Sequence, residues 1–313
     1  MSEAAAGQRL DNFLLGALKG VPRSHIYRLI RSGQVRVNSG RVNPKHRLKA
    51  GDRVRVPPVA TRAPAPTSAS GGSLDWLAER IVHEDSRLLV LDKPAGLAVH
   101  GGTGVALGCI EALRALRPEL PELELVHRLD RATSGCLLVA KRRSALRTLH
   151  ALLREGRVDK RYLTLVKGRW SEPNAEISAP LVTKRGAGES RVRVATGGKA
   201  AKSAFRLIDT LGRTASLLEV AIATGRTHQI RVHAAHAGHP VAGDDRYGDP
   251  EFNDAMRRFG LHRMFLHSRS IAFVWPESGE DFSVDVPLPP ELSAVLTALA
   301  EGKRGRADRA PRA

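Results

Sequence analysis

A stretch of small residues, prolines and glycines divides the 313-residue chain into two parts of unequal length. Residues 59–74 consist mostly of Ala, Pro, Ser, Thr and Gly, which bury little surface and order poorly. We therefore expect a flexible linker at 59–74 between a small domain at 7–58 and a larger domain at 75–300. The polar residues 301–313 are expected to form a disordered basic tail.

Basic side chains are concentrated in the small domain. The whole chain has a formal net charge of +18. Residues 7–57 contain 12 Lys or Arg and two Asp, so 12 − 2 gives +10 for this part alone. Cations near phosphates release condensed counterions, so this charge favours a nucleic-acid partner. The alternative is a surface that only keeps the chain in solution, which needs far less charge.

The spacing of apolar residues predicts two short helices in the small domain, over 10–18 and 24–33, followed by short β pieces near 35–37 and 54–56. One face of such a module would be cationic and suit an RNA backbone, although a merely solvated charged face is the alternative. The arginines that we expect to contact RNA are Arg9, Arg23, Arg28, Arg31 and Arg36.

The larger domain mixes apolar, β-rich segments with fewer helices. This mixture predicts an α+β domain with a central mixed or antiparallel β-sheet flanked by helices and loops. We expect strands near 87–91, 135–140, 161–166, 204–208, 216–223 and 270–275, and helices near 110–116, 144–154, 228–237 and 290–300.

Cysteine content and hydropathy exclude several classes of protein. Cys109 and Cys136 are the only cysteines, which is too few for a disulfide framework or a zinc knuckle. A reducing, cytoplasmic compartment fits best. The first residues contain no apolar signal segment, and no apolar run approaches the roughly 18 residues that span a bilayer, so we expect no membrane partner.

One carboxylate lies between two arginines, in His127-Arg128-Leu129-Asp130-Arg131, ahead of a Thr-Ser-Gly turn. Nearby positive charge lowers the pKa of a carboxyl group, and an ionised carboxylate can act as a nucleophile or a base. From spacing alone, however, the more common outcome is an aspartate that caps the turn and pairs with a surface arginine.

Two further short segments are ambiguous when taken alone. In Lys160-Arg161-Tyr162 an aromatic ring stands between cations and could stack on a base, although a core tyrosine is the more common outcome. Lys93-Pro94-Ala95-Gly96 follows a predicted strand, and a structural turn is the better interpretation there.

The segment from Thr224 to His233 runs from a turn into a predicted helix and contains Arg226, His228 and Arg231. Residues 228 and 231 lie three apart and share a helix face. Four histidines within residues 228–239 allow a metal site as a rival interpretation. No Glu or Cys joins them at ligand spacing and arginines are interleaved, so we expect no metal.

Taken together and in this order, these segments resemble the RluA/RluC/RluD family of RNA pseudouridine synthases. Residues 198–203, 265–268 and 286–289 match further blocks of that family. Residues 7–13 and 23–38 resemble an S4 (αL-like) RNA-binding domain. Ala234 and Ser203 depart from the family pattern, since members often have a larger aliphatic residue and a threonine there, but neither touches the expected chemistry.

The resemblance implies an isomerase that converts uridine in RNA to pseudouridine without a cofactor. Asp130 would be the catalytic carboxylate, and addition to C1′, addition to C6 and deprotonation of C2′ all stay open. Arg231 would pair with Asp130, and Tyr162 would pack against the target base. Arg128, Arg226 and His228 would contact RNA, with Arg128 entering the helix where the uridine flips out.

The S4-like segment indicates the RluC type of the family, which acts on large-subunit (23S) ribosomal RNA in bacteria. We therefore expect a monomeric, cytoplasmic enzyme that binds this RNA or a ribosome assembly intermediate. One alternative is the same reaction on another RNA, such as transfer RNA. A second is a non-catalytic RNA-binding protein of ribosome assembly, although binding alone gives no reason for a carboxylate to face a polyanion.

Overall fold

The computed structural model describes residues 6–18, 21, 23–59, 74–101, 107–185 and 190–307. The chain divides into two compact units, Met1–Gly72 and Ser73–Ala313. Most of the predicted linker at 59–74 lies outside the described residues, as do residues 308–313 of the predicted tail. In the described segments, no helix is both long and apolar enough to cross a membrane.

The smaller unit contains the elements that the apolar spacing predicts. Helix α1 (Leu10–Ala17) precedes α2 (Arg23–Arg31), and strands β1 (Arg36–Val37) and β2 (Val54–Arg55) pair antiparallel. The helices pack together because their apolar positions recur at three- and four-residue intervals and so fall on one face each. The core that they share with the strands includes Leu10, Leu14, Ile26, Leu29, Ile30, Val35 and Val37.

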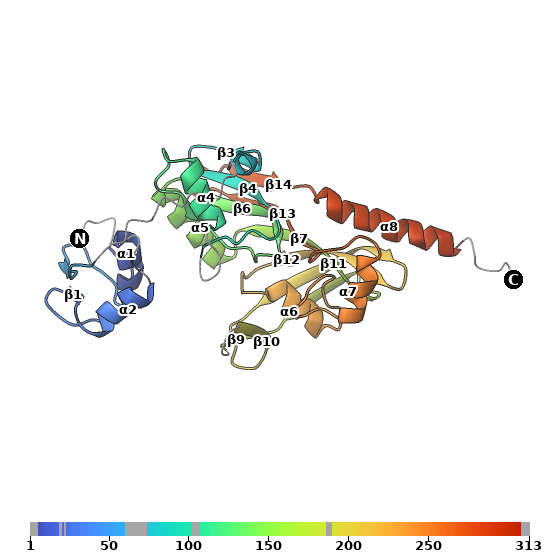
Figure 1. The fold of residues 1–313 in the computed structure, drawn as a ribbon, viewed down its shortest axis with the longest axis horizontal. Helices are drawn as coiled ribbons and strands as arrows, with labels where there is room; N and C mark the ends of the chain where they lie inside the picture. The colour runs from blue at the N-terminus through green and yellow to red at the C-terminus, as the bar shows by residue number, and fades with distance from the viewer. Residues whose placement is uncertain are drawn as a thin grey trace. The chain divides into compact units, whose positions relative to one another are not determined.

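A large mixed β-sheet forms the larger unit (Figure 1). The pairing of β6 with β13 is parallel and the other pairings in this sheet are antiparallel, so the predicted mixed sheet is confirmed. In spatial order the strands are β3 (Ile81–Glu84), β4 (Leu88–Lys93), β6 (Ser134–Ala140), β13 (Leu266–Val274), β7 (Asp159–Lys167), β12 (Ala215–Ile222), β11 (Lys202–Leu211) and β8 (Asn174–Ser178), with β5 (Glu124–Leu125) beside β6 and β14 (Asp281–Asp285) beside β13.

Strand β4 shows why the apolar runs become central strands. Leu89 and Leu91 belong to one core cluster, whereas Leu88 and Val90 belong to another, so successive side chains alternate between the two faces. A continuous apolar run is typical of a strand covered on both sides. Helices α3 (Asp75–Ala78) and α4 (Cys109–Leu116) contribute to the first cluster, and α5 (Arg143–Glu155) contributes to the second.

Two further helices, α7 (Pro250–Arg257) and α8 (Pro290–Ala307), pack in a third cluster with residues of β7, β11 and β12. Helix α8 continues to Ala307, past residue 301, where the predicted tail begins. Ala and Glu at 300 and 301 have high helix propensity and let the helix continue past its last buried apolar residue, Leu299.

The sequence did not predict a two-stranded sheet of β9 (Leu181–Arg185) and β10 (Ser190–Val194), which stands off the main sheet (Figure 1). Its Val192 packs against Val232 of helix α6 (Gln229–His236). The alternation of Arg and Val in β10 covers four residues, the lower limit of the alternating pattern that predicts a half-covered strand. This small sheet matters because it contacts the helix that carries Arg231.

Candidate active site

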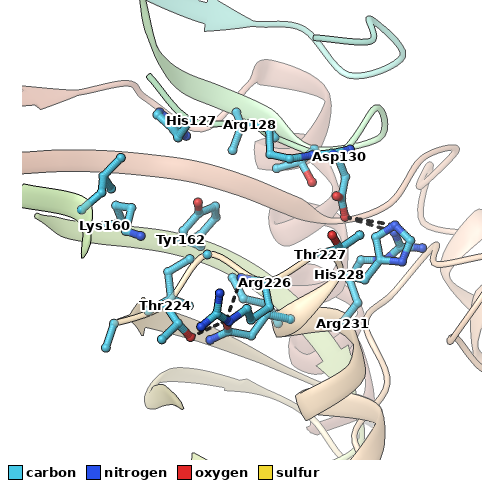
Figure 2. A pocket seen from close by; sticks show the side chains of 18 of the residues that line it. His127, Arg128, Asp130, Lys160, Tyr162, Thr224, Arg226, Thr227, His228 and Arg231 are labelled. Carbon is cyan, nitrogen blue, oxygen red and sulfur yellow. Dashed lines mark hydrogen bonds and ion pairs between the residues drawn. The ribbon is translucent and has the colours of Figure 1, made fainter. Parts of the chain in front are cut away.

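A pocket of about 540 Å³ brings together three segments that are far apart in the sequence (Figure 2). The loop before β6 supplies Asp130, strand β7 supplies Tyr162, and the turn and helix after β12 supply Arg231. All six residues that were predicted to act in the larger domain line this pocket: Asp130, Tyr162, Arg231, Arg128, Arg226 and His228.

The loop that carries Asp130 is fixed from behind by Lys93, which is fully buried. Its Nζ donates to the carbonyls of Pro94 at 2.8 Å, Leu97 at 2.9 Å and Arg131 at 3.3 Å. The Gly96 amide donates to the Arg131 carbonyl as well, at 2.7 Å. The Lys-Pro-x-Gly segment is therefore a turn, as predicted, and it also ties down the residue next to Asp130.

Gly135 sets where the same loop enters the sheet. Its φ is +102°, in the region that favours glycine, and a Cβ atom there would lie 2.1 Å from the Ser268 carbonyl oxygen. The close approach allows β6 to pair with β13 at the point where Ser268 lies opposite Gly135. Any side chain at 135 would push the start of β6, and with it the Asp130 loop, away from the sheet.

Arg231 links two aspartates at the pocket wall. Its Nε and Nη2 donate to the two carboxylate oxygens of Asp244 at 2.7 and 2.8 Å, and its Nη1 donates to Oδ2 of Asp130 at 3.1 Å. Asp244 is fully buried, whereas the Asp130 side chain is 17% exposed. The bidentate pair fixes the guanidinium plane, and the third hydrogen bond directs Asp130 toward the pocket.

Charge and burial compete at this ion-pair chain. Burial opposes ionisation of Asp244, yet its hydrogen bond and ion pair with Arg231 hold the pKa of the carboxyl group below its usual range. Burial likewise opposes the charge on Arg231, and its contacts with Asp244 and Asp130 raise its pKa above the usual value. Both groups are charged at neutral pH, so Asp130 faces a permanent cation.

His228 also lies close to the Asp130 carboxyl group. Its φ is +55°, and its Nε2 lies 3.8 Å from Oδ2 of Asp130. Burial lowers the pKa of the imidazole despite the neighbouring Asp130. The Tyr247 hydroxyl lies 2.9 Å from Nδ1 and accepts the Val192 amide at 3.0 Å. When neutral His228 accepts a hydrogen bond from the Tyr247 hydroxyl at Nδ1, its Nε2–H is directed at Asp130.

Tyr162 and Lys160 project from the same face of β7, because they are two residues apart on the strand. Burial raises the pKa of the Tyr162 hydroxyl, so the phenol keeps its proton. Lys160 is 5% exposed, and burial lowers the pKa of its amine to about 8. Burial and this nearby cation lower the pKa of His127 to about 3, and its Nε2 accepts the Leu138 amide at 3.1 Å.

Two of the three predicted RNA-contacting residues of the larger unit lie at the exposed side of the pocket, whereas the third, His228, lies beside Asp130. Arg128 and Arg226 are both exposed, and Arg226 donates from Nε to the Ala200 carbonyl at 3.2 Å. A second hollow of about 850 Å³ shares Arg128 and Asp130 with the pocket. Its other lining residues include Arg131, Arg191, Arg246, Arg257 and Arg263, which give it a cationic wall.

The arginines predicted for RNA contact in the smaller unit differ in how free they are. Arg28 and Arg31 are exposed on α2, and Arg31 donates to the Tyr27 carbonyl. Arg9 pairs with the buried Asp11, and Arg36 donates to two backbone carbonyls of its own turn. Arg23 begins α2, but its side chain lies outside the described part of the structure.

The histidines that suggested a metal site serve separate partners. His233 contacts Ser203 Oγ and the Ala179 carbonyl, and His239 contacts the Lys167 carbonyl. Across the described residues, no group of three or more His, Cys, Asp or Glu side chains could hold a metal ion. The residues present give no reason to place a metal beside Asp130.

Three residues of the site were missed in the sequence: Asp244, Tyr247 and the amine of Lys160. The Gly243-Asp244 pair after the histidine-rich helix was visible in the sequence. The structure shows why glycine stands there: φ of Gly243 is +71°, and a Cβ atom would lie 2.2 Å from the Arg263 carbonyl oxygen. Tyr247 gave no local signal. Its ring lies 5.0 Å from the Arg231 guanidinium, which only the folded chain reveals.

Comparisons with known proteins agree with this geometry. The family profile described as RNA pseudouridylate synthase matches residues 87–236, and the S4 domain profile matches residues 8–54. A ribosomal large subunit pseudouridine synthase C from Pasteurella multocida is 52% identical over 97% of this chain and 94% of its own length. The Escherichia coli protein of the same name is 49% identical, over 95% of each chain.

Solved structures point the same way. The human protein RNA pseudouridylate synthase domain containing 1 is 28% identical, with a TM-score of 0.58 over 72% of this chain and 89% of its own. Fold, pocket and relatives together define an RNA-modifying isomerase. The chain belongs to the RNA pseudouridylate synthase family, whose reaction isomerises uridine in RNA to pseudouridine.

Proposed function

We propose that this protein converts specific uridines of large-subunit (23S) ribosomal RNA to pseudouridine, with Asp130 as the catalytic carboxylate. Relatives that are about half identical over nearly their full length are named ribosomal large subunit pseudouridine synthase C, which supports this substrate. The observation that carries the proposal is the chain Asp244–Arg231–Asp130, because it holds the Asp130 carboxyl group in a fixed direction at the wall of a pocket large enough for a nucleoside.

The reaction balances without a cofactor. The bond from N1 to C1′ breaks, the base turns, and C5 forms a bond to C1′; the proton on C5 leaves and N1 gains one. Attack at C1′, attack at C6 and removal of the C2′ proton each need a directed carboxylate, and the hydrogen bond from Arg231 fixes the direction of Asp130. Tyr162 packs against the base, and its protonated hydroxyl is available for a late proton transfer.

The target uridine must leave the helix, because neither C1′ nor C5 can exchange bonds within a stack. Flipping costs a few kcal/mol, which contacts to the flanking backbone can offset. Exposed Arg128 and Arg226 at the mouth, His228 inside it, and the cationic second hollow supply such contacts. Arg9, Arg23, Arg28, Arg31 and Arg36 would add affinity from the S4 domain.

The domain roles and cellular setting complete the proposal. An S4 domain at 7–58 binds RNA, a linker at 59–74 joins it to a catalytic domain from residue 75, and the enzyme acts as a monomer. It would work in the cytoplasm, on ribosomal RNA or a ribosome assembly intermediate. The profile matches at 8–54 and 87–236 support the two assignments of function.

The decisive variant is Asp130→Asn, which keeps the shape of the side chain and removes its charge. We expect pseudouridine formation, measured by carbodiimide modification and primer extension on ribosomal RNA, to fall by more than about 10³-fold. Asp209→Asn is the matched control, since Asp209 is exposed on β11 outside the pocket, and it should leave the rate unchanged. Undiminished activity of Asp130→Asn would refute the assignment.

Mapping pseudouridine in total RNA with and without the protein separates the alternatives. Loss of sites in large-subunit ribosomal RNA supports the proposal, whereas loss only in transfer RNA would reassign the substrate. If no site is lost, the protein is a binding factor for ribosome assembly. The ion-paired carboxylate argues against that last outcome, because an acidic group facing RNA weakens simple binding.

A further inference from the structure

Lys160 is a buried cation without an anionic partner. The residue is 5% exposed, and in the described part of the chain no hydrogen bond or ion pair of its amine is found. Burial alone accounts for the lowered pKa of the amine, with no carboxylate offsetting it. A buried charge that lacks a partner is costly, so its retention in a pocket wall calls for a reason beyond stability.

The position of the amine suggests what it serves. Lys160 and Tyr162 project from one face of β7, and Figure 2 shows Tyr162 between Lys160 and Asp130. The turn residue nearest the Lys160 amine is Gly225, where a Cβ atom would lie 3.9 Å from Nζ of Lys160. The absence of a side chain there leaves the amine open to the pocket.

A uridine whose C1′ lies near Asp130 and whose base packs on Tyr162 would direct the far edge of the base toward Lys160. A phosphate would remain nearer the exposed mouth, where Arg128 and Arg226 lie. We propose that Lys160 is a further catalytic residue that donates a hydrogen bond to a uracil carbonyl oxygen and stabilises the negative charge that the base acquires during isomerisation.

This role holds for each route that the site permits. When the bond from N1 to C1′ breaks, its electron pair stays on the base and spreads over N1, O2 and O4. When a carboxylate adds to C6, the charge moves onto the conjugated O4. Forming the new bond from C5 to C1′ takes this charge off the base. The C5 proton then leaves, N1 gains a proton, and on the C6 route the bond from C6 to the carboxylate oxygen breaks. An ammonium group beside a carbonyl oxygen therefore favours the charged intermediate over the substrate.

The inference rests on the proposed function, so wild-type enzyme on its RNA is the first measurement. Lys160→Met fills the same space without charge. We expect its single-turnover rate at saturating RNA to fall by roughly 100-fold, with little change in KM. Lys167→Met is the matched control: Lys167 lies on the same strand but pairs with Asp249 outside the pocket, and its loss should leave the rate unchanged.

RNA with 2-thiouridine or 4-thiouridine at the target position identifies the contacted oxygen, because sulfur accepts hydrogen bonds poorly. At either O2 or O4, replacement by sulfur should slow the wild-type enzyme by a factor about tenfold larger than the factor by which it slows Lys160→Met. Lys160→Gln, which keeps a donor without the charge, should retain part of this difference and serves if Lys160→Met fails to fold.

The outcomes separate the two proposals. If the wild-type protein makes no pseudouridine, the proposed function fails and this role falls with it. If the wild type is active and Lys160→Met matches it, or raises only KM as a phosphate contact would, the role of Lys160 is refuted while the function stands. The role of Lys160 would also be refuted if, at each of the two positions, sulfur slowed the wild type and Lys160→Met by the same factor.

Discussion

Replacing Asp244 with asparagine tests whether the buried ion pair behind Arg231 holds the site together. Arg231 donates two hydrogen bonds to Asp244 and one to Asp130. Asparagine keeps one acceptor oxygen, but its amide then places a donor against a donor of Arg231. The change leaves the guanidinium buried with only the partly exposed Asp130 as a counter-ion.

The size of the effect follows from these contacts. Removing one member of a buried ion pair costs about 3–5 kcal/mol, so the free energy of unfolding of the larger unit should fall by about that amount. Asp130→Asn removes a single hydrogen bond from a side chain that is 17% exposed, and should cost no more than about 1.5 kcal/mol. The two variants should thus separate stability from activity.

Urea unfolding followed by tryptophan fluorescence measures this difference. All three tryptophans, Trp76, Trp170 and Trp275, lie in the larger unit, so the signal reports that unit alone. In activity assays, Asp244→Asn should lower kcat by roughly tenfold to a hundredfold with little change in KM, because Arg231 without its bidentate partner holds Asp130 less rigidly.

The pH dependence gives an independent check. The pKa of Asp244 is lowered in the folded protein from an ordinary value of 3.8, so its stabilisation is complete above that value and is lost as pH falls through the folded pKa. The gap between wild type and Asp244→Asn should therefore narrow in acid. A variant within about 1 kcal/mol of wild type at pH 7, or one that changes KM alone, would refute the reasoning.

Three further predictions concern other parts of the chain. Gly135→Ala should lower the unfolding free energy by at least about 2 kcal/mol, because of its positive φ and the Ser268 carbonyl; a thermal melt equal to wild type would contradict this. Lys160→Met should be more stable than wild type at pH 7, because it removes a buried charge, and this difference in unfolding free energy should shrink by about 3 kcal/mol as pH rises from 7 to 11, since the amine pKa is lowered from 10.5 to about 8. A difference in urea titrations that stays constant with pH would disprove it. Arg28→Gln should reduce the slope of log RNA affinity against log salt concentration by about one. Arg36→Gln should reduce the slope less, because the Arg36 guanidinium donates to carbonyls of its own turn. Equal slopes for Arg28→Gln and wild type would count against phosphate contact by Arg28.

The sequence predicted those elements that are buried because most of their own residues are apolar. The run Leu88–Leu91 is buried on both faces, and the strand near it was expected. Strand β8 alternates polar and apolar residues over its five positions and β10 only over its last four, so both carry the pattern of a half-covered strand, at the short end of what such a pattern can establish. The parallel pairing of β6 with β13 joins residues about 130 apart and has no local signature.

At Asp130 the turn predicted from the local sequence and the ion pair expected from the family resemblance are both present. The Thr133 amide donates to the Asp130 carbonyl at 3.1 Å, so the segment is the turn that its residues predict. The side chain does not cap that turn but points to Arg231, 101 residues later. The resemblance to a family supplied this partner, whereas spacing alone favoured a surface ion pair.

Asp244 and Lys160 were missed because a sequence does not say whether a charged residue is buried. The structure buries both, yet it treats them differently. Asp244 has a bidentate partner in Arg231, so its charge is compensated within the protein and its first task is to hold that arginine. Lys160 has no such partner among the described residues. Because an uncompensated buried cation lowers stability, and because it faces the pocket of Asp130, its missing partner is best supplied by the substrate.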